Sequence, residues 1–215
     1  DYSLNDVVVL YRTNYQSRLI EDSLRRKSIP YHIVGGVKFY DRKEIKDALA
    51  YLRFINNYKD DIAFLRIINF PTRGLGKTSI NKILRMKLEG DGDILEVLDA
   101  IKSGDLGKKQ VKSIKSFLKL IRGLKALSQE KNAYEVAASL IDQIELEEHY
   151  SIQGTPEAAD RWQNVQELLN SVQDYCENSE NGSLTSFLEE VSLLTDIDRW
   201  NSNDECVTLM TVHSS

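Results

Sequence analysis

The chain has 215 residues, 41% hydrophobic and 28% charged, which is the composition of a soluble globular protein with room for one large or two small domains. No apolar run approaches the roughly 20 residues that span a membrane, no signal-peptide pattern is present, and two isolated cysteines predict a reducing compartment without a disulfide framework. The net charge of −5 is uneven: residues 1–89 carry 17 Lys/Arg against 10 Asp/Glu, and residues 90–215 carry 11 against 23, so a polyanion contact is expected mainly in the first part.

The N-terminal segment has the pattern of a strand, a helix and a second strand. Asp6–Tyr11 (DVVVLY) is a β-branched apolar run typical of a buried strand. A helix is expected from about residue 15 to 27, with Leu19, Ile20 and Leu24 on its apolar face. Tyr31–Val34 is the second strand. This β-α-β unit predicts a parallel sheet with a right-handed crossover.

Polar residues follow each of these strands. Arg12, Thr13 and Asn14 come directly after the first strand, and the Gly35–Lys38 turn follows the second. Ligands of open α/β sheets lie beyond the carboxyl ends of the strands, so these residues are expected to meet at one edge of the sheet.

The next helix has a cap signal and an apolar stripe. Asp41 followed three residues later by Glu44 resembles a capping box. The stripe at helical spacing is made by Ile45, Ala48, Leu49, Leu52 and Ile55. The polar segment 56–60 after it is the expected domain boundary, and Asp60 and Asp61 are expected to cap a short helix.

Asn69–Ile80 (NFPTRGLGKTSI) leads from that short helix into an apolar-periodic segment. Gly76, Lys77 and Thr78 match the second half of a phosphate-binding P-loop, G-x-x-x-x-G-K-[ST]. The position of the first P-loop glycine is occupied by Pro71, which has no N–H to donate and cannot take a positive φ.

A helix–hairpin–helix clamp on DNA is the second interpretation of this stretch, and an ordinary corner between two helices is the third. In a clamp, Gly74 and Gly76 permit a positive-φ turn and close backbone approach, the start of the second helix presents its positive dipole end to a phosphate, and Arg73 and Lys77 supply charge. The whole chain favours the clamp, because the stretch lies within a helical region away from the strand ends.

Helical patterns continue to about residue 200. Helices are expected at 93–102, 108–125, 134–147, 157–176 and 184–195. The second of these carries a basic stripe, for which a solvated face and a secondary contact to duplex DNA are both open. The members of the stripe are Lys108, Lys112, Lys115, Lys119 and Arg122.

Cys206–Val212 (CVTLMTV) alternates as a strand, so the chain has the pattern of a sheet domain with a helical insertion. No arrangement of residues supports independent catalysis: His32, His149 and His213 are far apart, and no metal-ligand spacing or G-x-S-x-G occurs. The residues themselves indicate a binding module or a part of a larger enzyme.

Three ordered blocks together resemble the UvrD/Rep/PcrA family of superfamily 1 DNA helicases. Val8–Leu24 (VVLYRTNYQSRLIEDSL) is similar to the motif IV of that family. Gly35–Arg53 (GGVKFYDRKEIKDALAYLR), followed by Asn69–Ile80, forms the second block. Val207–Ser215 (VTLMTVHSS) is similar to the first half of motif V.

The resemblance implies an α/β fold with a large all-α insertion: a partial RecA-like parallel sheet, related to P-loop NTPases, carries a helical domain with a helix–hairpin–helix-like DNA-binding turn. Residues 1–56 and 203–215 would belong to motor domain 2A, and residues 57–202 to domain 2B. The family unwinds DNA in the 3′ to 5′ direction with ATP and Mg²⁺. Its Walker A and B residues lie in another domain, and motif V here lacks its Lys-Gly-Leu-Glu continuation, so no cofactor, metal or turnover is expected in this piece.

The resemblance also implies sequence-independent contacts to the DNA backbone, which suit an enzyme that works on any sequence. Arg12 and Asn14, with Tyr11 and Thr13 nearby, would touch single-stranded DNA, and Lys38 would neutralise a phosphate. The turn at residues 72–78 would contact duplex DNA. Residues near the end of motif V would couple the binding site for single-stranded DNA to the nucleotide site. The residues implied for these last two roles are Thr72, Arg73, Gly74, Leu75, Gly76, Lys77 and Thr78 in the turn and Thr211 and His213 in motif V.

The expected location is the bacterial cytoplasm, in association with the nucleoid and not with a membrane. The expected processes are DNA repair or replication, with repair or replication proteins as further partners. The alternative function is a non-catalytic protein-interaction or regulatory module of a helicase or nuclease complex, whose working surface would be the acidic helical half. Tyr11 and His213 also have structural interpretations, as a core residue and as a residue that orders the strand end, and Phe39 and Tyr40 are expected to pack in the core.

Overall fold

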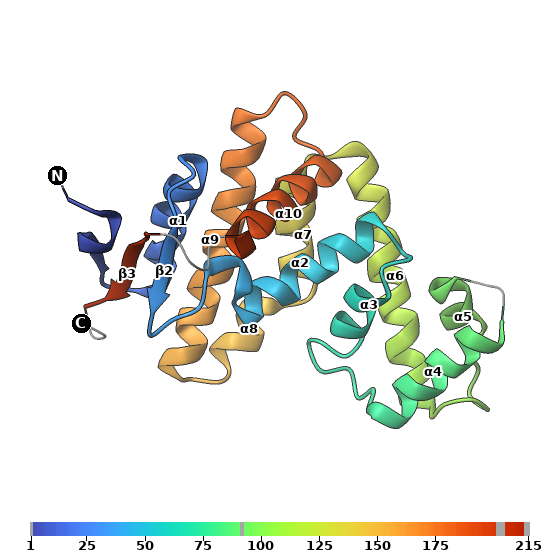
Figure 1. The fold of residues 1–215 in the computed structure, drawn as a ribbon. Helices are drawn as coiled ribbons and strands as arrows, with labels where there is room; N and C mark the ends of the chain where they lie inside the picture. Colours follow the sequence, from blue (N-terminus) through green and yellow to red (C-terminus); the bar gives the residue numbers. More distant parts are fainter. Residues whose placement is uncertain (1, 91–92, 201–204, 213–215) are drawn as a thin grey trace.

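The computed structural model describes residues 2–90, 93–200 and 205–212, which form a small sheet unit beside a larger helical unit (Figure 1). Within the described residues, no helix is long and apolar enough to cross a lipid bilayer.

The sheet has three parallel strands, β1 (Val8–Tyr11), β2 (Tyr31–Val34) and β3 (Val207–Thr211). Their order is β1-β3-β2, and both outer strands are parallel to β3. The predicted parallel sheet is therefore confirmed. The strands of the predicted β-α-β unit are not hydrogen-bonded neighbours, because β3 returns from the far end of the chain and lies between them.

β1 is less buried than its sequence predicts. The exposed fractions of Val8 and Leu10 are 51% and 53%, whereas Tyr11 is only 5% exposed. β1 is an outer strand of the described sheet, and Val9 and Tyr11 are the side chains that join the small apolar cluster of the sheet unit. The prediction of a buried strand is therefore wrong for β1 in this structure.

α1 (Ser17–Arg26), preceded by a short 3₁₀ turn (Asn14–Gln16), occupies the place predicted for the first helix. Its apolar face differs from the prediction: Ile20 and Leu24 pack on the sheet cluster, but Leu19 is 57% exposed. The other covered face of α1 is polar. Its buried members are Ser17, Arg18, Glu21 and Arg25.

The helical unit contains α2 (Lys43–Asn56), the central helix of the molecule. All five residues of its predicted apolar stripe are buried, and so are Tyr51 and Phe54 on other sides. Burial on several sides arises because α2 packs against α3, α6, α7, α9 and α10, so it behaves as a core helix rather than as a surface helix.

The predicted capping box at the start of α2 is wrong. The N-cap is Arg42, which makes no side-chain cap hydrogen bond. Asp41 instead ends a 3₁₀ turn (Phe39–Asp41) and pairs with Lys46 at 2.6 Å. Glu44 is turned inward, where its carboxylate accepts a hydrogen bond from the Asn164 side chain at 2.6 Å.

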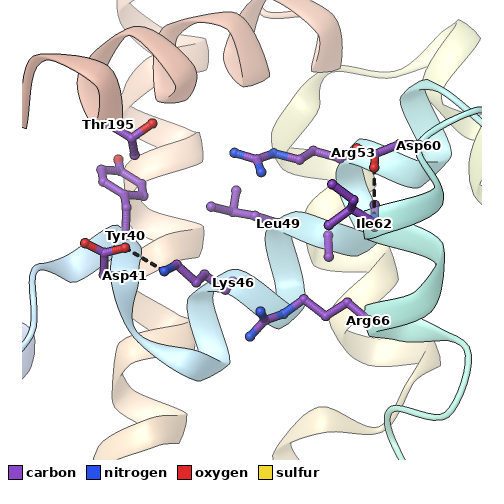
Figure 2. A pocket seen from close by; sticks show the side chains of 11 residues that line it. Tyr40, Asp41, Lys46, Leu49, Arg53, Asp60, Ile62, Arg66 and Thr195 are labelled. Atoms are coloured by element: carbon purple, nitrogen blue, oxygen red, sulfur yellow. Dashed lines mark hydrogen bonds and ion pairs between the residues drawn. The ribbon is translucent and has the colours of Figure 1, made fainter. Parts of the chain in front are cut away.

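A pocket of about 260 Å³ lies beside α2 and the start of α3 (Figure 2). Two of its cations are paired with acids: Lys46 pairs with Asp41, and Arg66 pairs with Asp47 at 2.7 Å. Arg53 forms no ion pair within the described residues. The pocket is therefore lined by both signs of charge.

The remaining helices follow the predicted order, with changed bounds. The predicted helix 134–147 is two helices, because Glu145 adopts a left-handed conformation with φ of 52° and interrupts it. Asp60 caps α3 as predicted, accepting a hydrogen bond from the Ala63 N–H at 2.9 Å. The helices are α3 (Asp61–Ile67), α4 (Lys77–Glu89), α5 (Ile94–Ala100), α6 (Lys108–Glu130), α7 (Ala133–Gln143), α8 (Leu146–Ser151), α9 (Pro156–Asn178) and α10 (Leu184–Trp200).

Apolar packing divides the chain into two clusters. The larger one runs from Phe39 to Val191 and includes α2. The smaller one is built on Tyr11, Tyr31, Val207 and Leu209 of the sheet. The domain boundary after residue 56 stays a prediction, and by packing α2 is part of the helical cluster.

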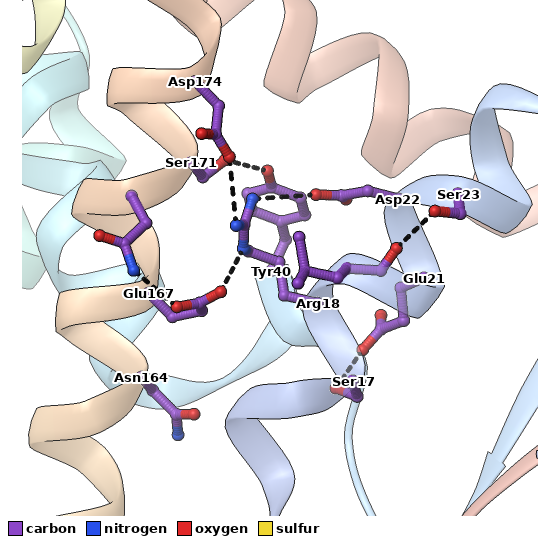
Figure 3. Close-up of polar contacts among 12 residues, drawn as sticks. Ser17, Arg18, Glu21, Asp22, Ser23, Tyr40, Asn164, Glu167, Ser171 and Asp174 are labelled. Atoms are coloured by element: carbon purple, nitrogen blue, oxygen red, sulfur yellow. Dashed lines mark hydrogen bonds and ion pairs between the residues drawn. The ribbon is translucent and has the colours of Figure 1, made fainter. Parts of the chain in front are cut away.

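Buried charges join the two units where α1 meets α9 (Figure 3). Arg18, which is 4% exposed, donates from Nε to Glu167 at 2.9 Å and from Nη2 to Asp174 at 3.3 Å, and it also contacts Asp22 of its own helix at 3.4 Å. Burial raises the pKa of Asp22, although the nearby Arg25 and Arg18 oppose that shift.

A second set of buried polar contacts surrounds Glu21, which is fully buried. Its carboxylate accepts hydrogen bonds from Ser17 at 2.6 Å, from Arg25 at 3.0 Å and from the Phe39 N–H at 3.0 Å. Arg42 continues the chain of contacts toward α9.

Arg42 donates to Ser17 Oγ at 2.6 Å and to Asn164 Oδ1 on α9 at 2.7 Å. Burial lowers the pKa of the Arg42 guanidinium, while Glu21 and Glu44 oppose that shift. The sheet unit is thus joined to α9 through charged side chains, and these contacts orient one unit against the other.

We predict that Arg18→Ala lowers the free energy of unfolding by about 3 kcal/mol, because Glu167 would remain partly buried without its cation. Urea denaturation of the 215-residue chain measures this change. Arg26→Ala, at an exposed position of the same helix, should change the value by less than about 0.5 kcal/mol. Equal effects of the two substitutions would contradict a structural role for the buried pair.

Candidate nucleic-acid interface

The turn between α3 and α4 is held by one asparagine. The Asn69 side-chain oxygen accepts hydrogen bonds from the backbone N–H groups of Arg73 at 2.8 Å and Leu75 at 3.1 Å. Leu75 is fully buried and anchors the turn in the helical core. The segment before the turn is helix α3, so the stretch lacks the strand–loop–helix order of a P-loop.

Arg73 points into the protein. Its guanidinium donates to the carbonyl oxygens of Ile67 at 2.9 Å and Phe70 at 2.7 Å, and to the Tyr51 hydroxyl at 2.6 Å. It also lies over the Phe117 ring, 5.2 Å from the centroid. Its side chain therefore serves the internal structure of the turn, a role that its position in the sequence does not reveal.

Tyr51, the aromatic partner of Arg73, belongs to α2 and carries a buried hydroxyl group. Burial raises the pKa of Tyr51 to about 12, although the neighbouring Arg73 opposes that shift. The hydroxyl also donates to the Phe70 carbonyl. The phenol is therefore neutral near pH 7 and serves as a fixed hydrogen-bonding group for the turn.

The two glycines of the turn have different backbone conformations. Gly74 has a φ of +72°, as predicted, whereas Gly76 has a φ of −73° and a ψ of 171°. The expectation of a positive φ at Gly76 is therefore wrong. A Cβ atom at either glycine would meet no atom within 4 Å, so the space beside the backbone is open at both.

The start of α4 offers backbone donors. Gly76 is the N-cap and makes no side-chain cap hydrogen bond, and a helix leaves its first N–H groups without intrahelical partners. The side chains of Lys77 and Thr78 are exposed next to these groups, and so is that of Thr72 earlier in the turn. Uncapped N–H groups, a positive dipole end and an adjacent lysine form a setting that favours an anion.

α6 carries a row of positive charge, and its first turn contacts α4. The Gln110 side chain donates to Ser79 Oγ at 3.2 Å, which joins the first turns of the two helices. The predicted basic stripe of α6 is exposed along its whole length. Arg122, at its far end, pairs with Asp99, whereas Lys108 lies in the same first turn of α6 as Gln110.

At the sheet edge, Gln16 orders the segment that follows β1. Its side-chain oxygen accepts hydrogen bonds from the N–H groups of Arg12 at 3.1 Å and Thr13 at 3.2 Å. The Arg12 side chain is exposed. The only sequence signal for this contact is the spacing of Gln16, three residues after Thr13 and four after Arg12.

Of the other residues predicted to meet at this edge of the sheet, the structure brings some together and not others. Tyr11 pairs in register with Thr211 of β3, and burial raises the pKa of the Tyr11 hydroxyl. Lys38 lies with its ammonium 5.0 Å from the ring centroid of Tyr31, the first residue of β2. His213 lies outside the described residues.

Asn14 is exposed. Phe39 and Tyr40 are 0% and 4% exposed, which confirms the prediction that both pack in the core. The Tyr40 hydroxyl contacts Ser171 Oγ at 3.2 Å, and burial raises its pKa to about 12.

A sheet unit carrying a helical unit with an exposed basic turn agrees with the family resemblance of the three sequence blocks. Residues 1–215 match the model of the UvrD-like helicase C-terminal domain, and the chain belongs to this family.

Two curated relatives illustrate the similarity. The ATP-dependent DNA helicase PcrA of Bacillus subtilis (strain 168) is 36% identical over 218 residues, which cover 99% of this chain and 30% of that protein. The ATP-dependent DNA helicase PcrA of Staphylococcus aureus (strain Mu50 / ATCC 700699) is 38% identical over 212 residues, which cover 98% of this chain and 29% of that protein. The chain thus spans less than a third of the length of these relatives.

We predict that Arg73→Ala lowers the free energy of unfolding by about 2 kcal/mol, since three partly buried acceptors lose a charged donor. Lys77→Ala should leave stability within about 0.5 kcal/mol of the parent chain, because its side chain is exposed. Urea denaturation compares the two variants. A loss of stability with Lys77→Ala and none with Arg73→Ala would reverse the assignment of their roles.

Proposed function

We propose that this chain is the DNA-binding part of an ATP-dependent 3′ to 5′ DNA helicase, and that the α3–α4 turn contacts the backbone of duplex DNA. The observation that carries the proposal is the uncapped start of α4: N–H groups next to Gly76, with Lys77 and Thr78 exposed beside them. A phosphate there would accept hydrogen bonds and neutralise the lysine. The contact would be independent of base sequence.

The lysine row of α6 would extend this surface along the duplex. It starts beside α4 at the Ser79–Gln110 hydrogen bond, and each lysine would displace a counterion from one phosphate. Arg73 would act indirectly, by holding the turn in shape, while Thr72 and Gly74 border the phosphate position.

We further propose the division of labour expected from the family. Residues 1–56 and 203–215 would form part of motor domain 2A, which contacts single-stranded DNA near Arg12, Asn14, Lys38 and Thr211, and residues 57–202 would form domain 2B. α2 would be the rigid connection between them, because it is buried among the helices of the larger cluster. Repair or replication proteins would be further partners of the whole helicase.

ATP and Mg²⁺ would be used by the whole helicase. The α3–α4 turn does not fit a triphosphate loop, because a helix precedes it and Pro71 replaces the first glycine. We therefore assign no nucleotide or metal to this turn.

Gly76→Val tests the phosphate contact. Its backbone conformation suits valine, and no atom obstructs the side chain, so the fold should survive with a loss of about 1 kcal/mol from a poorer N-cap. We expect duplex binding to weaken about tenfold, as for the loss of one charged hydrogen bond, and single-strand binding to change less than about twofold. Fluorescence anisotropy with a tailed duplex and with a single strand measures both.

Gly104→Val is the matched control, since a Cβ atom at Gly104 also meets no atom within 4 Å and Gly104 belongs to the loop before α6, not to the start of α4. Gly74 is less suitable, because valine at a φ of +72° is strained. Equal weakening of duplex and single-strand binding by Gly76→Val would contradict the proposed contact.

The α6 stripe has its own test in the salt dependence of duplex binding. Replacing Lys112, Lys115 and Lys119 by Gln should reduce the slope of log K against log salt by about two to three. Replacing Lys27, Lys59 and Lys131 by Gln removes the same charge from exposed positions elsewhere and should leave most of the slope unchanged. Equal slopes for the two triple variants would contradict a contact between the lysines of α6 and duplex DNA.

A further inference from the structure

A groove of about 500 Å³ lies between α7, α8 and α9, on elements that do not contribute to the proposed DNA surface. Its apolar lining includes Ile141 and Leu146, which are buried, and Trp162 and Leu169, which are half-buried. A groove of this size can accept one or two large side chains. The half-exposed indole of Trp162 is available for contact inside it.

The rim of the groove is acidic. Asp142, Glu145, Glu147 and Glu148 line it and are all exposed. Within the described residues, none of these four carboxylates forms an ion pair, and no Lys or Arg is part of the lining. Four uncompensated negative charges around an apolar floor repel a nucleic-acid backbone and attract a cationic partner.

The acids are fixed around the groove by the local backbone. Glu145 is in the left-handed region, with φ of 52° and ψ of 44°, at the break between α7 and α8. This break turns the chain so that Asp142 at the end of α7 and the acids at the start of α8 border the same groove. The charge is therefore concentrated on one short corner instead of along a helix face.

We propose that this groove binds a basic amphipathic segment of a partner protein. An apolar side chain of the segment would enter beside Leu169, and a Lys or Arg would lie over Trp162, where a cation is attracted to the face of an indole. Its other cations would meet the acidic rim. Charge complementarity selects this occupant, because the floor alone would accept any apolar side chain while the rim admits a cationic one.

The probe is an acetylated peptide of repeating Lys-Leu-Ala-Lys units, and the readout is tryptophan fluorescence of the 215-residue chain with Trp200→Phe, which leaves Trp162 as the reporter. We expect saturable binding that weakens with salt. The same peptide with Glu in place of Lys should not bind. No change in the Trp162 signal, or equal binding of both peptides, would overturn the proposal.

Replacing Glu145, Glu147 and Glu148 by Gln should weaken binding of the lysine peptide about tenfold. The matched control replaces Glu130, Glu180 and Glu189 by Gln, which removes the same charge from exposed positions outside the groove. If both triple variants bind the lysine peptide equally weakly, the peptide is attracted only by the net charge of the chain. This result would overturn the proposed binding site.

Sedimentation of the chain without peptide tests whether the occupant is a second copy. If the chain self-associates and the groove triple variant does not, the occupant of the groove is another copy of this chain. This result would overturn the proposal of a partner protein. The groove variant should retain duplex binding, which separates a failure of this inference from a failure of the proposed DNA interface.

Discussion

The buried ion pair between Arg18 and Glu167 is one constraint on how the two units of this protein are arranged. Taking these charges out of water is costly, and the mutual attraction of a buried pair repays the cost only when the geometry is good. Such a pair adds little net stability over apolar residues of the same size, but it tolerates few orientations. α1 can therefore meet α9 in only a narrow range of arrangements, and the sheet unit is oriented with it.

This constraint also explains where prediction from the sequence succeeded and failed. The strands and most helices could be predicted, because apolar periodicity reports local structure. The buried face of α1 could not, because Arg18, Glu21 and Arg25 are spaced three and four residues apart, as in a solvated ion-paired face. The partners of Arg18 on α9, Glu167 and Asp174, lie more than a hundred residues away in the sequence, and spacing contains no information about them.

The candidate DNA surface shows the same limit at the level of single side chains. The location of the turn could be predicted from Pro71, Gly74 and Gly76, because proline and glycine mark turns between helices. The directions of Arg73 and Lys77 were not, because both are cations beside a glycine. The structure separates them through Tyr51, a partner on α2 that turns Arg73 inward. The guanidinium of Arg73, which is predicted from the sequence to contact DNA, thus stabilises the turn instead.

Shape and charge then combine in one arrangement. Asn69 and Arg73 satisfy the inner groups of the turn, so the outer N–H groups at the start of α4 are fixed without being used. The first turn of α6, where the lysine row begins, contacts the first turn of α4 through Gln110 and Ser79, whereas residues 130–215 carry 18 acidic residues against 3 basic ones. A polyanion is attracted to the first surface and repelled by the second. In the proposed function, the acidic helices would restrict DNA to the side of α4 and α6, and the groove between α7, α8 and α9 would be left to the proposed cationic partner.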